Sequence, residues 1–341
     1  MPDAHNLRDF EELARACMEP GQFAYYAGGS GDEVTLRDNE SAFARRRLRP
    51  RVLVDVSQID TATTLLGQAV TMPVGIAPTA QHGLAHPEGE CATVRAASRA
   101  GALYVASTQS TRPIEEIGAA DGGPFWFQLY VQDNTGPRTE ALIRRAESAG
   151  CTAIALTVDL AVPGRREREL RALLDTSVLR PGNFPDAPAA APPPVTLTWS
   201  DVTWLRATTK LPIILKGIMT GEDARLAVEH GVDAVWVSNH GGRQLDRASA
   251  SIDVLEEIVD AVAGNAEVYL DGGVRRGSDV VTALALGARA VFVGRPILYA
   301  LACGGQEGVT LALDLMAAEV RYSMSLLGTP SISDITRAHV V

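Results

Sequence analysis

The sequence has few cysteines, and their spacing excludes two common kinds of site. Four of its 341 residues are cysteine, at positions 17, 91, 151 and 303. These positions lie too far apart for the paired spacing of a zinc site or for a disulfide framework. Free thiols suit a reducing compartment, so we expect a cytoplasmic protein.

The chain also lacks long apolar runs and an excess of basic charge. No uninterrupted apolar stretch reaches the roughly 18 residues that cross a bilayer, and the first residues show no signal-peptide pattern. We therefore expect neither a membrane protein nor an exported one. The formal net charge of −10 argues against binding to nucleic acid or to anionic lipid. One basic run, residues 45–51, is interpreted as a solvated or ion-paired segment.

From residue 72 onward, short apolar runs rich in valine, isoleucine and leucine alternate with segments of helical period. This alternation is typical of repeated βα units whose strands are covered on both faces. Eight units predict an α/β fold, a TIM (β/α)8 barrel. The expected strands are residues 73–77, 103–107, 125–130, 153–158, 212–216, 234–238, 267–271 and 290–294.

The alternative is a doubly wound open sheet, which would carry a glycine-rich phosphate loop after its first strand. Here the glycine-rich turns follow the seventh and eighth strands, which favours the barrel. We expect residues 1–70 to form an N-terminal helical cap of the same domain, starting with a helix over 7–18, and residues 71–341 to form the barrel. A long connection, about residues 160–198, follows the fourth strand. Its proline- and alanine-rich run over 185–194 predicts a mobile lid loop.

Polar residues gather where the expected strands end, and in a TIM barrel these ends build the active site. Gln128 and Tyr130 end the third strand, and Lys216 ends the fifth. A lysine at the end of an apolar strand is rarely placed there for packing. Thr157 and Asp159 end the fourth strand, and the run Ser238-Asn239-His240-Gly241-Gly242-Arg243 follows the sixth. Their convergence on one face predicts a catalytic site.

The turns after the last two strands predict a phosphate-binding site. They are Asp271-Gly272-Gly273-Val274-Arg275-Arg276-Gly277 and Gly294-Arg295. Glycines let backbone N–H groups approach an anion, while the arginines and the helix N-termini that follow supply positive charge. A plain strand-to-helix turn would explain the glycines but not an arginine at both turns.

Together these residues resemble the FMN-dependent α-hydroxy acid oxidase and dehydrogenase family, which includes glycolate oxidase, lactate oxidase and hydroxymandelate oxidase. The resemblance spans almost the whole chain, and its motifs are specific in combination. They are Tyr25-Tyr26-Ala27-Gly28-Gly29, Ala77-Pro78-Thr79-Ala80, Ala85-His86-Pro87-Glu88-Gly89-Glu90, Gln128-Leu129-Tyr130, Leu156-Thr157-Val158-Asp159, Leu215-Lys216-Gly217, the run from Ser238 to Asp246 and the two phosphate turns.

The resemblance implies that the chain uses FMN to oxidise an L-2-hydroxy acid to a 2-keto acid. His240 matches the family's catalytic base, and Asp159 matches the carboxylate that orients it. Arg166 and Arg243 match the two arginines that bind the substrate carboxylate, with a further hydroxyl from Tyr25. The resemblance leaves open whether the α-hydrogen leaves as a hydride to the flavin or as a proton to His240.

The remaining matched positions concern the flavin and the substrate hydroxyl. Tyr130 matches the tyrosine near that hydroxyl, and Lys216 matches the lysine beside the flavin N1 and C2 oxygen. The positions expected around the flavin ring and ribityl chain are Pro78, Thr79, Ala80, Ser107, Gln128, Thr157 and Ser238. Those expected to hold ribityl and phosphate are Asp271, Gly272, Gly273, Val274, Arg275, Gly294 and Arg295.

Gln109 departs from the glycolate oxidase pattern, in which a bulky aromatic residue walls the substrate pocket. We expect Gln109 either to bind a polar group of a substrate larger than glycolate or to face solvent. Residues 160–163 also replace the usual turn after Asp159.

The absence of a haem motif favours O2 as the electron acceptor, with release of H2O2. Three alternatives stay open: a dehydrogenase that passes electrons to a quinone or protein, an FMN-dependent isomerase of the isopentenyl diphosphate type, and a non-catalytic flavoprotein. The resemblance also implies a homotetramer.

Overall fold

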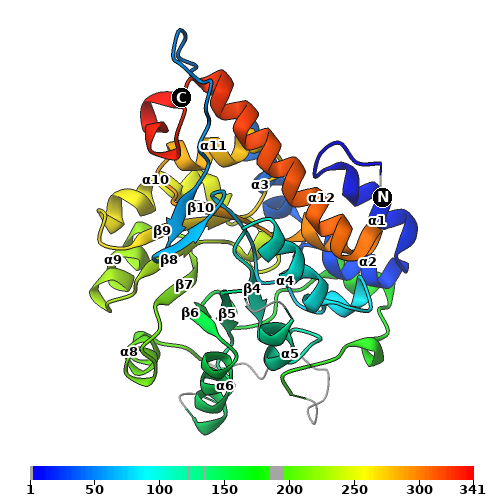
Figure 1. The fold of residues 1–341 in the computed structure, drawn as a ribbon. Helices are drawn as coiled ribbons and strands as arrows, with labels where there is room; N and C mark the ends of the chain where they lie inside the picture. Colours follow the sequence, from blue (N-terminus) through cyan, green and yellow to red (C-terminus); the bar gives the residue numbers. More distant parts are fainter. Residues whose placement is uncertain (1–2, 121–122, 134–135, 185–195) are drawn as a thin grey trace.

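A parallel eight-stranded barrel forms the centre of the molecule (Figure 1). The structure, a computed structural model, describes residues 3–120, 123–133, 136–184 and 196–341. The strands are β3 (Val74–Ile76), β4 (Val105–Ser107), β5 (Phe125–Leu129), β6 (Cys151–Thr157), β7 (Ile213–Ile218), β8 (Ala234–Val237), β9 (Glu267–Asp271) and β10 (Ala290–Val293). They pair in the order β3-β10-β9-β8-β7-β6-β5-β4. An isolated parallel bridge between Ile76 and Tyr104 joins the two ends. The barrel expected from the sequence is thus confirmed.

Helices surround the barrel; seven connect successive strands, and α12 follows the last strand. They are α4 (Glu90–Arg99), α5 (Ile114–Ala119), α6 (Pro137–Ser148), α8 (Trp199–Thr208), α9 (Gly221–Glu229), α10 (Ser251–Val262), α11 (Gly277–Ala285) and α12 (Arg295–Leu327). Within the described ranges, no helix is long and apolar enough to span a bilayer.

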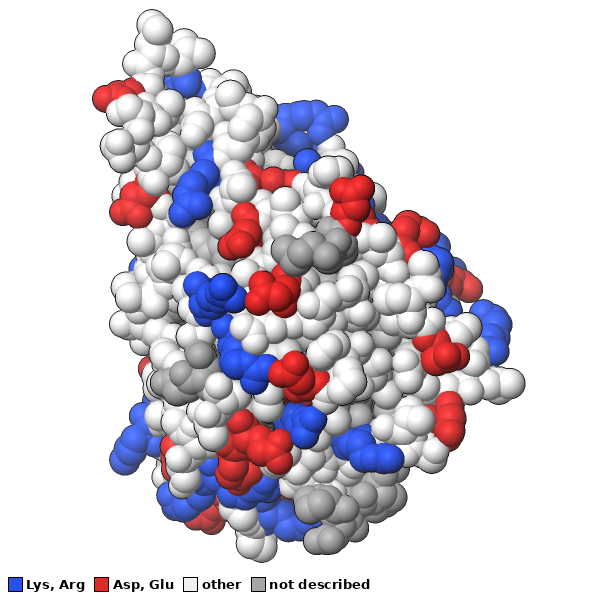
Figure 2. Space-filling view, turned by 45° about the vertical axis from the view of Figure 1, so that its right-hand side comes forward, with Lys and Arg blue, Asp and Glu red and all other residues white. Residues whose placement is uncertain are grey.

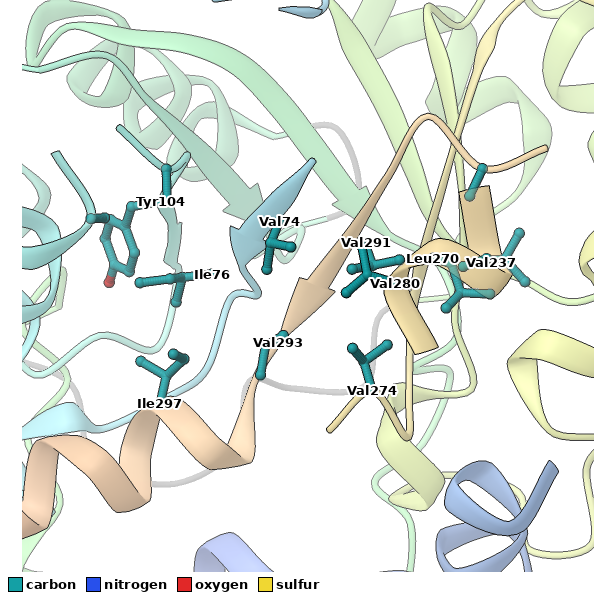
Figure 3. Close-up of a cluster of buried hydrophobic side chains, with 14 of the residues drawn as sticks. Val74, Ile76, Tyr104, Val237, Leu270, Val274, Val280, Val291, Val293 and Ile297 are labelled. Atoms are coloured by element: carbon teal, nitrogen blue, oxygen red, sulfur yellow. The ribbon is translucent and has the colours of Figure 1, made fainter. Parts of the chain in front are cut away.

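Two cores lie on opposite faces of the strands, because successive side chains of a strand alternate in direction. Val74, Ile76, Val291 and Val293 point toward the helices and join the larger core (Figure 3). The other set fills the barrel, with a layer of large rings from Trp126, Trp236, Tyr269 and Phe292. The Trp236 and Phe292 ring centroids lie 4.1 Å apart.

The segment before the barrel contributes three helices and a hairpin. The helices are α1 (Asp9–Cys17), α2 (Pro20–Ala27) and α3 (Val34–Ala44), and α1 corresponds to the helix expected over 7–18. The hairpin, β1 (Thr63–Leu65) and β2 (Gln68–Val70), was not predicted. Leu65 and Val70 join the core inside the barrel. The Leu66 N–H donates to the Glu267 carboxylate at the start of β9, at 3.2 Å, so the hairpin closes the amino-terminal end.

The connection after β6 has structure that the sequence did not predict. It contains α7 (Glu167–Ala172) and a short 3-10 turn, η2 (Thr176–Val178). Asn183 is only 2% exposed and donates to the Thr108 carbonyl at 3.0 Å. The proline-rich run for which we expected mobility, residues 185–194, lies outside the described residues.

Charged side chains on the surface form mixed pairs. Figure 2 shows acidic and basic residues interspersed on the face in view. In the basic run over 45–51, Arg45 binds Asp38 at 2.8 Å, and both Arg45 and Arg46 bind Asp253. This part of the run is ion-paired, as expected.

Candidate active site

A ring of polar side chains lies at the carboxyl end of the barrel. Each member follows an apolar residue of the barrel interior by two positions, so the strand period points it to the same side. Gln128, for example, follows Trp126 and is 2% exposed. Its amide nitrogen donates to the Thr157 hydroxyl at 2.9 Å, and its oxygen accepts from the Ser107 hydroxyl at 3.2 Å. The ring comprises Ser107, Gln128, Thr157, Lys216, Ser238 and Asp271.

Above this ring opens a cavity of about 710 Å³, within the range of sites that bind cofactors and small ligands. Its wall contains all but two of the residues expected at the site. Those expected residues that line it are Tyr25, Pro78, Thr79, Ala80, Ser107, Gln109, Gln128, Tyr130, Thr157, Arg166, Lys216, His240, Arg243, Asp271, Gly272, Gly273, Val274, Arg275, Gly294 and Arg295. The two exceptions, Asp159 and Ser238, do not line the cavity but contact His240 and Lys216, which do.

His240 stands between Asp159 and Tyr130. Its Nδ1 lies 3.0 Å from the Asp159 Oδ1, and its Nε2 lies 3.4 Å from the Tyr130 hydroxyl. With Nδ1 directed to the carboxylate, Nε2 faces the cavity and can accept a proton. His240 has a φ of 58°, an uncommon left-handed conformation for a residue with a side chain. A hydrogen bond from its own N–H to the Ser238 hydroxyl at 3.1 Å supports this conformation.

Asp159 is a buried carboxylate whose charge is balanced by its neighbours. Burial alone raises the pKa of Asp159, but His240 and Lys216 outweigh burial and hold the pKa below its ordinary value. Its second oxygen, Oδ2, is buried without a hydrogen-bond partner among the described residues. The carboxylate therefore stays ionised and can stabilise a protonated His240 ring.

The two arginines expected to bind a carboxylate reach the same cavity. Arg243 donates to the Tyr25 carbonyl at 2.8 Å and to the Gly28 carbonyl at 2.9 Å. Burial and then the charges of Arg166 and Arg295 hold the pKa of Arg243 below its ordinary value. A bound anion would offset this crowding of positive charge. Arg166 has one acidic neighbour, the Glu169 carboxylate at 3.4 Å.

Lys216 is only 4% exposed and has two hydrogen-bonding partners. Its Nζ lies 2.7 Å from the Ser238 hydroxyl and 2.7 Å from the Asp271 Oδ2. The Ser238 hydroxyl in turn donates to the Asp271 Oδ1 at 2.6 Å. Ser238 is fully buried and its hydroxyl contacts Lys216 Nζ and the His240 N–H; its expected contact with the flavin stays a prediction.

The turn after β9 brings backbone and an arginine to one corner of the cavity. Gly272 and Gly273 have φ values of 97° and 85°, a region that favours glycine. A Cβ on Gly273 would lie 2.0 Å from the Asn39 carbonyl oxygen, so the close approach of α3 also requires glycine. Arg275 pairs with Glu40 at 2.9 Å.

The two helix N-termini near this corner differ. Asp279 accepts hydrogen bonds from the Arg275 and Arg276 N–H groups, both at 2.9 Å, and thereby caps α11. The N-terminus of α12 has no side-chain cap, and Gly294 and Arg295 line the cavity there. We expected both N-termini to attract an anion. At α11 the N–H groups of Arg275, Arg276 and Gly277 already donate to the Asp279 and Glu319 carboxylates, so the backbone at the start of α12 is the more available of the two, and the phosphate site stays a prediction.

Sequence reasoning did not assign several residues of the wall. Gln81 and Glu169 are polar, and Leu160, Pro163, Leu179 and Leu197 form an apolar part. Tyr26 lies in a motif that was recognised, and its hydroxyl donates to the Gln81 carbonyl. Leu160 and Pro163 belong to the altered turn over 160–163, Glu169 lies on α7, and Gln81, Leu179 and Leu197 lie in loops. No role was assigned to any of these side chains from the sequence. Within the described part of the chain, no group of three or more residues could hold a metal ion.

Comparisons with known proteins identify the family. Residues 14–341 match the model of the FMN-dependent dehydrogenase family. The chain is 48% identical to an L-lactate oxidase of Nostoc sp., with 97% of this chain and 96% of the relative covered. It is 45% identical to glycolate oxidase 1 of Oryza sativa subsp. japonica, with 100% and 96% covered. A crystal structure of mandelate oxidase with (S)-2-phenylpropionate has a TM-score of 0.90, 45% identity and coverage of 97% and 96%.

The chain belongs to the FMN-dependent dehydrogenase family, which confirms the resemblance and the cofactor expected from the sequence. The cavity fits FMN chemically. The polar ring offers hydrogen-bond donors and acceptors to a heteroaromatic ring, and the corner with Arg275 and Arg295 offers positive charge and backbone N–H groups to a phosphate.

Proposed function

We propose that this protein oxidises an L-2-hydroxy acid to the 2-keto acid and that O2 reoxidises the flavin with release of H2O2. The observation that carries the proposal is the meeting of the His240–Asp159 pair with Arg166 and Arg243 in one cavity. The histidine–aspartate pair supplies a base, and the two arginines supply binding groups for a carboxylate. A substrate that needs both has an acidic group next to the carbon that loses hydrogen.

In this proposal the arginines orient the substrate. Arg243 is held by carbonyl groups of α2 and its C-terminal cap, and its remaining N–H groups bind the substrate carboxylate together with Arg166 and the Tyr25 hydroxyl. The substrate hydroxyl then lies between Tyr130 and His240. His240 Nε2 accepts a proton, and the Asp159 carboxylate stabilises the imidazolium that results.

FMN, when bound, accepts the two electrons that the substrate loses. Its ring is expected beside Pro78, Thr79, Ala80, Gln128 and Lys216, and the positive charge of Lys216 favours added electron density on the ring. Its ribityl phosphate is expected at residues 271–275, 294 and 295. Arg295 donates to three carbonyls, those of Tyr26, Gly28 and Gly241, each at 2.9 Å, so it also ties the cap to the site.

O2 is the proposed acceptor because relatives at 45–48% identity are named as oxidases. The alternative is a dehydrogenase that passes electrons to a quinone or a protein. The isomerase and the non-catalytic flavoprotein are less favoured, since neither requires the arginine pair beside a histidine–aspartate pair.

We also propose a cytoplasmic homotetramer that binds neither membranes nor nucleic acid, with residues 1–70 as a cap that completes the site. Tyr25 and Tyr26 of this cap line the cavity. Two exposed apolar side chains before β1 support association of copies, since Val52 is 81% exposed and Leu53 is fully exposed. Light scattering after size exclusion tests the oligomeric state, and a monomer would contradict it.

The decisive experiment mixes the FMN-loaded protein anaerobically with L-2-hydroxy acids, from glycolate and lactate to mandelate and acids with polar ends, and follows bleaching of the flavin. Air is then admitted. We expect bleaching by at least one acid, then rapid recolouring with release of peroxide. Bleaching without rapid recolouring would favour a dehydrogenase, and no bleaching by any acid would contradict the proposed oxidation.

A further inference from the structure

Gln81 joins four segments around the cavity, although no role was assigned to it from the sequence. It is 5% exposed and has a φ of 59°, a conformation that is uncommon for a residue with a long side chain. Its N–H donates to the Gln109 carbonyl at 3.2 Å, and its side-chain amide donates to the same carbonyl at 3.0 Å. Its own carbonyl accepts from the Tyr26 hydroxyl.

The Gln81 side chain also pairs with the connection that follows β6. Its amide nitrogen donates to the Arg180 carbonyl at 2.9 Å, and its amide oxygen accepts from the Arg180 N–H at 2.8 Å. A side-chain amide here satisfies both backbone groups of one residue, as a neighbouring strand would. We name residues 179–184 the strap.

The strap is held at a second point. Asn183 donates to the Thr108 carbonyl at 3.0 Å and to the Ser110 hydroxyl at 3.1 Å, and its oxygen accepts from the Ile114 N–H at 2.9 Å. These partners belong to the segment that follows β4 and leads into α5, the segment that also carries Gln109. Two buried amides therefore fasten the strap to the loop that carries Gln109.

Two of the joined residues form part of the cavity wall. Leu179, at the start of the strap, and Gln109 both line the cavity. The Gln109 backbone is fixed by Gln81 and by the Ser107 hydroxyl, which accepts from the Gln109 N–H at 3.1 Å. The Gln109 side chain makes no hydrogen bond to the described residues, so its position depends on this fixed backbone.

We propose that Gln81 is a positioning residue that sets substrate discrimination by holding Gln109 and Leu179 at fixed places in the cavity wall. The inference rests on the proposed function for the identity of the substrate. Gln81 hydrogen-bonds Tyr26, Gln109 and Arg180 but neither His240 nor Asp159, so its loss changes which acid fits more than it changes the chemistry.

Two variants separate the effect of the Gln81 side-chain hydrogen bonds, here called the amide clamp, from the effect of its positive φ. Gln81→Leu keeps the bulk and removes all side-chain hydrogen bonds. Gln81→Asn keeps the amide and suits a positive φ, but its side chain is one methylene too short to reach Arg180. Gln68→Leu is the control, because Gln68 is a partly buried glutamine at the other end of the barrel, where its oxygen accepts from the Thr152 hydroxyl at 3.2 Å.

Hydrogen exchange read by mass spectrometry tests the clamp without any substrate. In both Gln81 variants we expect peptides that cover residues 174–184 to exchange roughly fivefold to tenfold faster than in the wild type. Peptides from β7 to β9 and the content of FMN should stay unchanged, and Gln68→Leu should leave the strap as it is. Unchanged exchange of the strap in Gln81→Leu would overturn the clamp, and retention in Gln81→Asn alone would assign the role to the backbone instead.

Kinetics test the consequence for substrates. We expect the ratio of kcat/KM between the best acid of the panel and a smaller or larger neighbour to fall roughly tenfold in both variants, through KM, with kcat changed less than about threefold. Faster strap exchange with an unchanged ratio would overturn the role in discrimination. If the wild type bleaches with no acid, the proposed function fails, while hydrogen exchange still decides whether the clamp exists.

Discussion

The two ends of the barrel are built from the same strands but serve opposite needs. At the amino-terminal end, the rings of Trp126 and Trp236 pack with other aromatic residues under the β1–β2 hairpin, and the Glu267 carboxylate meets this layer at the Tyr269 hydroxyl. Two residues further along the strands, the positions are occupied by Gln128 and Ser238 of the polar ring. Because residues two apart on a strand point the same way, the inner face of the barrel carries an apolar layer and, above it, the polar ring of the candidate site.

The difference teaches where stability and function reside. Burying apolar rings stabilises the fold at about 25 cal/mol per Å². In contrast, a buried pair such as Lys216 with Asp271 loses much of its attraction to the cost of removing both charges from water. We therefore expect substitutions in the layer of aromatic rings to affect stability. Substitutions in the cavity above the polar ring should affect turnover. Four substitutions can break or sharpen this contrast.

The largest effect is expected from His240→Ala. Loss of a base that is positioned by Asp159 should slow anaerobic flavin reduction by roughly a thousandfold, while FMN remains bound. Stopped-flow measurement of bleaching with the best acid tests this expectation. His230→Ala is the matched control, since its ring stacks on Trp199 outside the cavity, and a loss of less than about tenfold in His240→Ala would argue against the assignment.

Trp236→Ala should act mainly on stability. The side chain is fully buried against Phe292, and truncation of such a residue costs about 3–5 kcal/mol. Urea unfolding at saturating FMN measures the change in free energy. Trp204→Ala, a partly buried tryptophan on α8, should cost less. An equal loss in the free energy of unfolding for the two variants would contradict a special role of the layer of aromatic rings in stability.

Asp159→Asn should reduce the rate of flavin reduction by roughly a hundredfold. The amide can still contact the His240 ring, but it supplies no negative charge to stabilise an imidazolium. The same stopped-flow assay measures the loss. A rate close to that of the wild type would show that orientation alone suffices.

The same variant tests a pH dependence. Because the pKa of Asp159 is lower in the folded protein than its ordinary value, its stabilising contribution is present above about pH 4 and is lost as pH falls through the folded pKa. The free energy of unfolding should therefore fall less steeply below about pH 4 in Asp159→Asn than in the wild type. Identical slopes would mean that the pKa of Asp159 is not lowered in the folded protein.

The smallest effect is expected from Gln109→Ala. If the side chain binds a polar group of the substrate, kcat/KM should fall by about tenfold for acids with polar ends and little for aliphatic acids. Steady-state oxygen consumption with matched pairs of acids measures this difference. Equal losses on both kinds of acid would remove the polar contact, and stability should change by less than about 0.5 kcal/mol.

Much of the barrel and of the candidate site could be predicted from the sequence. The eight expected strands lie close to the observed ones, and β9 has the predicted ends, because continuous apolar runs between turn-forming residues are a strong local signal. His240 and the two glycine–arginine turns follow strands in sequence, and Lys216 lies near the carboxyl end of β7, so the barrel topology alone brings them to one end. Their catalytic and binding roles stay predictions.

Other features depend on contacts between segments that lie far apart in the chain. The β1–β2 hairpin could not be predicted, because its stability comes from Glu267 and the core inside the barrel. Ser238 follows the same alternation as Gln128, but the hydrogen bonds of its hydroxyl to Lys216 and Asp271 join three strands and could not be read from the sequence. The carboxylates of Asp279 and Glu319 similarly bind N–H groups at the start of α11, and Glu319 comes from α12, far along the chain.

The sequence by itself thus determined the barrel, the end at which the site lies and the residue types that can perform the chemistry, since each follows from strand period and order along the chain. Only the tertiary structure decided which of these residues face the cavity and which support them from behind. It also decided that Gln81, to which the sequence assigned no role, joins the cap, two loops and the strap. Such contacts depend on distances of about 3 Å between segments, and no local pattern in the sequence records those distances.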